Sequence, residues 1–189
     1  MKKLLAFMFA VLAVMFMNVP FGGTAEAAWV AAIPLQTDEA KVERAGDLNN
    51  YYWDIIVDRF PYPQYELIDD DKVLEAVPEE GLKNYDKPTL QAIADKVDAD
   101  IVIAMRVDKV ASRAIGGRYE PTLECFMQGQ FISYNRQTGK FYNKKFIYKE
   151  EIEEVLTYRN DWQQEVFSSY VRRGINRTLE EPKAKKKIK

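Results

Sequence analysis

The chain has 189 residues, with 27 Lys and Arg against 29 Asp and Glu and a formal net charge of −2. This balance gives no reason to expect a nucleic acid partner. No histidine is present, which excludes a Ser-His-Asp triad, a Cys-His dyad and an HExxH zinc site. The only cysteine is Cys125, so an internal disulfide is excluded as well. Because Cys125 lies in the strand-like run 123–127, we expect it to be buried.

The first 28 residues predict a secretory signal peptide. Lys2 and Lys3 precede an unbroken apolar run over 4–17, and residues 25–27 (Ala-Glu-Ala) give the small-x-small pattern of a cleavage site. The run is shorter than the roughly 20 residues that a spanning helix needs. We therefore expect cleavage after Ala27 or Ala28, which assigns 1–28 to the signal peptide and sends the mature chain to the periplasm or the medium.

No cysteine lies near the cleavage region, so the sequence predicts that the protein is not a lipoprotein. Residues 29–180 are expected to form one domain. Residues 181–189 are rich in lysine and predict a disordered basic tail, which would make at most a weak contact with an anionic membrane surface.

The first half of the domain alternates strands and helices. The apolar run 29–35 is typical of a buried parallel strand. Helical spacing of apolar residues predicts a helix over 39–60, with Thr37 or Asp38 as its N-cap and Pro61 after its end.

The next segments repeat this alternation. A strand is predicted over 65–68, followed by a short helix over 71–77 that Asp69 or Asp70 would cap. Pro88 is interpreted as a breaker before a helix that begins at Thr89. The run 101–107 predicts a third buried strand.

The pattern then becomes rich in β-structure. Strands are predicted over 118–134 and 141–149, joined by a hairpin turn in which Gly139 takes a left-handed conformation. Gly116 and Gly117 predict the preceding turn. A helical turn is expected over 150–156 and a C-terminal helix from Asp161.

Together these elements predict an α/β domain with some α+β character. Its mixed sheet would have about five strands, with three parallel strands joined by helical crossovers and then an antiparallel meander. Helices would flank the sheet, and the C-terminal helix would close the chain.

Three local patterns resemble a known family. These are AAIPL at 31–35, YELIDDDKVLEAV at 65–77 and LQAIADKVDADIVIAMRV at 90–107. They are similar to the anticodon-binding-like α/β domain of bacterial envelope proteins, found in the TolB N-terminal domain, CsgG and LpoB. The resemblance implies a fold used for envelope contacts and brings no catalytic residue and no cofactor. This chain lacks the lipid-bearing cysteine of CsgG and LpoB and the propeller of TolB.

Two acidic groups are the candidates for chemistry. The stronger one is Asp69, Asp70 and Asp71, which offers hard oxygen ligands for a divalent cation or a set of helix-capping side chains. The glutamates at 150–154 could supply a carboxylate for glycoside hydrolysis or form a solvated face. Neither group has the spacing of a known metal loop, so no catalytic or metal residue is assigned.

The aromatic residues suggest an interaction surface. They cluster at the end of the long helix and on the meander, and aromatic side chains commonly anchor protein interfaces and glycan sites. The alternative is that most of them are core residues. The candidates are Phe60, Tyr62, Tyr65, Tyr134, Tyr142 and Tyr148.

The sequence therefore predicts an exported, non-enzymatic cell-envelope protein that binds a protein partner or a peptidoglycan component. The alternatives are a glycan-acting hydrolase with a Glu/Asp pair, or a small-ligand or metal-binding module. The oligomeric state stays open.

Overall fold

The computed structural model describes residues 27–78, 81–116, 122–153 and 161–180. Of the signal peptide predicted over 1–28, residues 1–26 lie outside the described residues, as does the basic tail predicted over 181–189, whereas Ala28 belongs to β1. The six described strands form one mixed sheet, which confirms the predicted fold class: β1 (Ala28–Ala32), β2 (Gln36–Thr37), β3 (Tyr65–Leu67), β4 (Ile101–Ile115), β5 (Thr122–Asn135) and β6 (Lys140–Glu153).

The strand order is β3-β1-β4-β5-β6, and β2 pairs with β4 beside β1. β1 runs parallel to both β3 and β4, as the helical crossovers predicted. β4, β5 and β6 are antiparallel neighbours, which confirms the meander. The sequence predicted about five strands because the two-residue strand β2 is too short to be recognised from its pattern.

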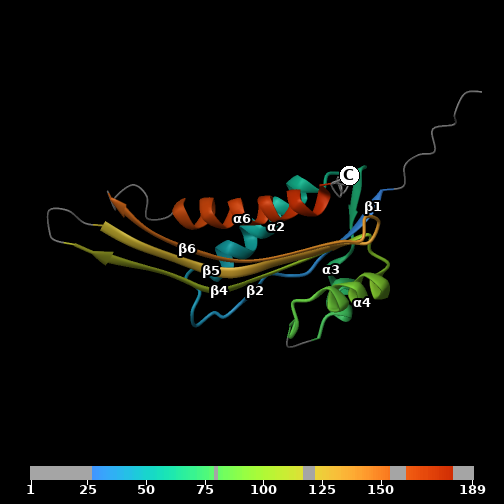
Figure 1. Cartoon of the computed structure of the whole chain (residues 1–189), viewed down its shortest axis with the longest axis horizontal. Helices are drawn as coiled ribbons and strands as arrows, with labels where there is room; N and C mark the ends of the chain where they lie inside the picture. The colour runs from blue at the N-terminus through green and yellow to red at the C-terminus, as the bar shows by residue number, and fades with distance from the viewer. Residues whose placement is uncertain (1–26, 79–80, 117–121, 154–160, 181–189) are drawn as a thin grey trace, which may run out of the picture.

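Helices cover the two faces of the sheet unequally. α2 (Ala45–Arg59) and α6 (Asp161–Leu179) lie on one face, which we call the helix face, and enclose the larger apolar core. α3 (Asp70–Ala76) and α4 (Lys87–Val97) lie on the other face and cover a smaller core. Figure 1 shows α3 and α4 at one end of the sheet only, while β4, β5 and β6 extend well beyond them.

The long first helix begins later than predicted. Its N-cap is Arg44, which has a left-handed φ of 59° and makes no side-chain capping bond, so the predicted caps Thr37 and Asp38 are wrong. Thr37 belongs to β2. Asp38 instead accepts a hydrogen bond from the Ala40 amide. The cause is tertiary pairing: Val42 forms a bridge with Val110 of β4, which holds this segment against the sheet.

The second helical pair is closer to prediction. Asp69 caps α3 by accepting from the Asp71 amide at 3.0 Å, as expected. Asp86 caps α4 by accepting from the Thr89 amide at 3.0 Å. Pro88 therefore lies in the first turn of α4 and does not precede it. This position suits proline, because the first-turn N–H groups of a helix have no intrahelical acceptor.

The meander is longer than its sequence pattern predicted. β6 continues through residue 153, so the helical turn expected over 150–156 is wrong for 150–153, and the remainder lies outside the described residues. Glu150 and Glu151 pair with Cys125 and Glu124 of β5. The pairing with β5 outweighs the local helical preference of the glutamates. The hairpin turn is confirmed, with φ of 66° at Gly139.

A β-bulge divides β4 into an inner and an outer half. The register shifts between Val107, which faces Gly129, and Lys109, which faces Gln128. Val107 and Val110 are therefore both buried on the helix face although three positions separate them. Gly129 opposite the bulge is tightly enclosed, because a Cβ there would lie 2.4 Å from the Arg106 carbonyl oxygen.

Candidate functional site

The six predicted aromatic residues do not share one surface. Phe60 is 3% exposed and packs edge-to-face against Tyr65 at 5.0 Å between ring centroids. Tyr134 is 7% exposed and belongs to the core under α4. Tyr62, in contrast, is 79% exposed. The structure therefore brings Phe60 and Tyr65 together and separates them from the tyrosines of the meander.

The two tyrosines of β6 pack under α6. Tyr142 lies 6.1 Å from Phe131 between ring centroids, and Tyr148 stacks on Trp162 of α6 at 5.9 Å. The Tyr148 hydroxyl donates to the Glu150 carboxylate at 2.8 Å. Burial, together with this bond, raises the pKa of Tyr148 well above its usual range. Both side chains are thus part of the helix-face packing.

The two predicted acidic groups lie at opposite ends of the molecule. Asp69, Asp70 and Asp71 are exposed at the start of α3, where partial burial and the neighbouring carboxylates raise the pKa of Asp70. Glu150 and Glu151 are exposed near the far end of β6. They cannot form a carboxylate pair with the aspartates. Among the described residues no group of three or more Asp, Glu or Cys side chains could hold a metal ion.

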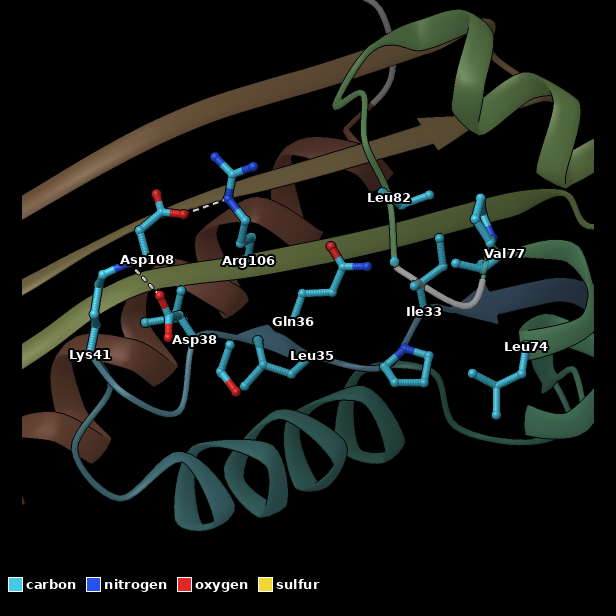
Figure 2. A pocket seen from close by; sticks show the side chains of 15 residues that line it. Ile33, Leu35, Gln36, Asp38, Lys41, Leu74, Val77, Leu82, Arg106 and Asp108 are labelled. Carbon is cyan, nitrogen blue, oxygen red and sulfur yellow. Dashed lines mark hydrogen bonds and ion pairs between the residues drawn. The ribbon is translucent and has the colours of Figure 1, made fainter.

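A pocket of about 790 Å³ lies between β1–β2, the end of α3 and the middle of β4. Figure 2 shows its apolar end, with Leu74, Val77 and Leu82, and its charged end, with Asp38, Lys41, Arg106 and Asp108. We call it the α3 pocket. It lies at the carboxyl end of β1, where open α/β sheets tend to bind ligands.

The charged groups of the α3 pocket are paired with one another. Lys41 lies 2.5 Å from Asp38, and Arg106 lies 2.5 Å from Asp108. The Arg106 guanidinium also lies 4.6 Å from the centroid of the Tyr85 ring. Because each cation already has a carboxylate partner, the described residues that line the α3 pocket leave no unpaired charge for recognising a charged ligand.

The meander presents a more distinctive surface on the side opposite α2 and α6. Its residues alternate with the buried helix-face residues and lie beyond the cover of α3 and α4. We call it the open face. Its members are Lys109, Ala111 and Arg113 of β4, Glu124, Phe126 and Gln128 of β5, and Lys145, Ile147, Lys149 and Glu151 of β6.

Apolar groups form the centre of the open face. Ile147 is 66% exposed although it is a large aliphatic residue. Phe126 lies on the neighbouring strand, opposite Lys149 and one diagonal step from Ile147. Lys109 lies over the Phe126 ring, with its Nζ 5.2 Å from the ring centroid. A hollow of about 400 Å³ surrounds this contact.

Positive charge dominates around this apolar centre. The open face has four cations, Lys109, Arg113, Lys145 and Lys149, against two carboxylates. Glu124 is shared by Arg113 at 2.9 Å and Lys149 at 3.2 Å. These cations, Lys149 first, hold the pKa of Glu124 below its usual range. The face is therefore net positive on a chain whose formal net charge is −2.

One sequence signal pointed to this face. Ile147 lies in the predicted strand 141–149, where strand alternation places it in the same row as the polar residues Asn143 and Lys145. An isoleucine among polar positions was the available sign of an exposed apolar contact. Phe126 shows the same sign on β5, because it alternates into the row of Glu124 and Gln128. Lys109 gives no such sign, because the bulge in β4 reverses the alternation that follows Val107.

Cys125 is buried on the helix face, as predicted, with its thiol donating to the Leu123 carbonyl at 3.7 Å. Burial, followed by the charges of Glu150 and Glu43, raises its pKa to about 11. Iodoacetamide at pH 8 should modify the native thiol at least about 100-fold more slowly than the thiol of the urea-unfolded chain, because the thiolate is the reactive form.

The raised pKa of Cys125 also makes the stability of the fold depend on pH. A folded-state pKa raised above the unfolded value contributes stability below about pH 9, and this contribution is lost as the pH rises toward 11. Mass spectrometry of the alkylated chain at several pH values measures the first effect, and urea unfolding at pH 8 and 10.5 measures the second. Equal alkylation rates in the native and unfolded chain would contradict this environment.

Among the described residues no helix is long and apolar enough to cross a membrane. No protein-family model matches the sequence, and no curated protein is similar to it. The chain is similar to several solved structures.

The C-terminal domain of LpoB from Salmonella enterica is 14% identical, with a TM-score of 0.38, over 68% of this chain and 87% of that one. Lipoprotein GNA1162 from Neisseria meningitidis is 12% identical, with a TM-score of 0.39, over 79% and 98%. The PelC dodecamer from Paraburkholderia phytofirmans is 8% identical, with a TM-score of 0.41, over 80% and 88%. The anticodon-binding-like label given to the sequence patterns stays a prediction.

Proposed function

We propose that this chain is an exported, non-enzymatic protein of the bacterial cell envelope that binds a protein partner through its open face. The N-terminal signal pattern and the absence of histidine support export and a binding role. The single observation that carries the proposal is the open face itself, an apolar centre with a positive surround on the part of the sheet that α3 and α4 leave uncovered.

The charge of the open face indicates the chemistry of the partner. An overall negative chain with a locally positive face is complementary to an acidic surface, and such complementarity guides association and orientation. The exposed Ile147 beside Phe126 would contact apolar side chains that lie among the acidic residues of the partner. A protein surface supplies both kinds of group. A peptidoglycan component supplies carboxylates with little apolar surface and is the alternative.

The experiment reverses two charges of the open face. Lys109→Glu combined with Lys149→Glu should abolish capture of the partner in a crosslinking pull-down from intact cells, because both changes oppose an acidic surface. The captured protein, once purified, should bind the wild-type chain at least about tenfold more tightly than the double variant. Raising the salt concentration should reduce this difference.

The control is Lys72→Glu on α3, which reverses the charge of one lysine at an exposed site away from the open face. It should leave binding unchanged. Binding of the wild-type chain to isolated peptidoglycan, with no protein captured, would favour the alternative. A partner held equally by the wild type and the double variant would contradict the open face as the binding surface. Retention of the chain in the cytoplasm would contradict the envelope assignment.

A further inference from the structure

The outer edge of the sheet is a long strand that no described segment covers. β6 has 14 residues and pairs with β5 on one side, and no described strand pairs with it on the other. Most of its side chains are exposed or half-buried. An edge strand presents a row of unpaired N–H and C=O groups, which makes it a template for another strand.

The charges along β6 are ordered. Lys140, Lys144, Lys145 and Lys149 occupy the first ten residues, and Glu150 and Glu151 follow directly. If a second copy of β6 lay antiparallel to the first, the basic part of each strand would approach the acidic end of the other. The strand is thus a candidate for pairing with itself.

Symmetry limits the possible registers. A twofold axis perpendicular to the sheet keeps each face of the sheet on the same side, so one residue of β6 must lie opposite itself. An axis at Ile147 would place Lys145 opposite Lys149 twice. An axis at Lys149 or Glu150 would place that charged residue opposite its own copy. Like charges directly opposite one another are destabilising.

An axis at Tyr148 gives a different result. It places Lys145 opposite Glu151 twice, on the open face, and it sets no like charges directly opposite each other within the strand. Directly opposite Cβ atoms in such a pair lie about 4.5–5.5 Å apart, which is within reach of a Lys–Glu ion pair. Among twofold axes placed at residues 145–150, only the axis at Tyr148 sets unlike charges directly opposite each other and sets no like charges opposite each other.

The helices are compatible with this pairing. α6 lies over β5 and β6, where Tyr170 stacks on Phe146 at 4.1 Å and Trp162 on Tyr148. With neighbouring strands about 4.8 Å apart, the α6 helices of two copies would lie about 10 Å from each other, an ordinary distance for packed helices.

We infer that two copies of this chain associate through β6, antiparallel about Tyr148, to form one continuous sheet held in register by reciprocal Lys145–Glu151 pairs. This inference goes beyond the proposed function, since it uses the edge of the sheet and a second copy of the chain. In this dimer the open faces of the two copies would lie side by side.

Charge reversal at the two paired positions tests the inference. In sedimentation equilibrium over the micromolar range, the wild-type chain without its predicted signal peptide should form dimers. Lys145→Glu and Glu151→Lys should each raise the dimer dissociation constant by about tenfold or more, because each sets two like-charge pairs across the axis. An equimolar mixture of the two variants should restore association, since every cross-axis pair is again Lys opposite Glu.

Lys109→Glu is the matched control, because it makes the same charge change on β4, away from the edge. It should not alter the dimer. Restoration in the mixture also shows that both variants are folded. A second measurement does not depend on charge: mixed Lys145→Cys and Glu151→Cys chains should form an intermolecular disulfide under mild oxidation. Neither variant alone should, because identical positions lie several residues from the axis.

A wild-type chain that stays monomeric throughout the micromolar range would overturn the inference. Dimers that neither charge reversal weakens, or that the mixture does not restore, would also overturn it. None of these results bears on the pull-down with the open-face double variant, so failure of the dimer and failure of the proposed partner binding are distinguishable.

Discussion

Phe131→Ala should lower the free energy of unfolding by about 3–5 kcal/mol. Phe131 is 2% exposed on the helix face of β5, where its ring packs against Gly174 of α6 and Tyr142 of β6. Removing the ring leaves a cavity that Gly174 has no side chain to fill. Urea unfolding followed by far-UV circular dichroism measures the loss. Ile147→Ala, at a 66% exposed position of the same sheet, is the control and should change stability by less than about 0.5 kcal/mol.

Gly174 should be coupled to Phe131. A Cβ at Gly174 would lie 2.5 Å from two carbons of the Phe131 ring. Gly174→Ala alone should therefore destabilise the chain by about 1–3 kcal/mol, despite the better helix propensity of alanine. In the Phe131→Ala background the same change should be neutral or stabilising. Additive effects in this double-mutant cycle would show that the two residues do not pack as described.

Gly129→Ala should lower the free energy of unfolding by about 3 kcal/mol. A Cβ at this position would lie 2.4 Å from the Arg106 carbonyl oxygen and 2.7 Å from Cζ of Phe146. The carbonyl belongs to β4 beside the bulge and cannot move without breaking strand pairing. The midpoint and slope of urea unfolding measure the cost, with an unchanged slope expected if the native state stays compact.

Gly46→Ala is the matched control for Gly129→Ala. Gly46 lies in the first turn of α2, and a Cβ there would have no atom within 4 Å. Alanine should stabilise the chain by about 0.5–1 kcal/mol, because it restricts the unfolded chain and favours the helix. Destabilisation by Gly46→Ala equal to that by Gly129→Ala would show that glycine replacement in general, and not the close approach to Arg106, is the cause.

Local patterns were sufficient to predict the sheet and its helical crossovers. The apolar runs at β1 and β4 and the cap at Asp69 are decided by nearby residues, so the sequence carried them. The start of α2 depends on the bridge between Val42 and Val110, which lie 68 positions apart in the chain and meet only in the fold. The end of β6 depends on its pairing with β5 in the same way.

The candidate surface was harder to predict. Tyr62 is exposed as an interface residue would be, but Phe60 and Tyr134 are buried, because an aromatic side chain gives no sign of which face of an element it occupies. The open face arises from the unequal length of the helical cover, which is a property of how α3 and α4 pack. The predicted aromatic residues pointed to the meander but did not include Phe126, and the position of Lys109 depends on the bulge in β4.

The bulge in β4 makes chain length, as well as residue type, a determinant of which side chains reach the partner-facing surface. Asp108 is the extra residue of the bulge, so its deletion would restore simple alternation and keep Lys109 on the open face and Val110 in the core. If the full-length strand paired without the bulge, its outer half would turn over, so that Val110 would face solvent and Lys109 the core. The bulge thus sets the face of every outer residue of β4 at once, whereas a single substitution in that half changes one position.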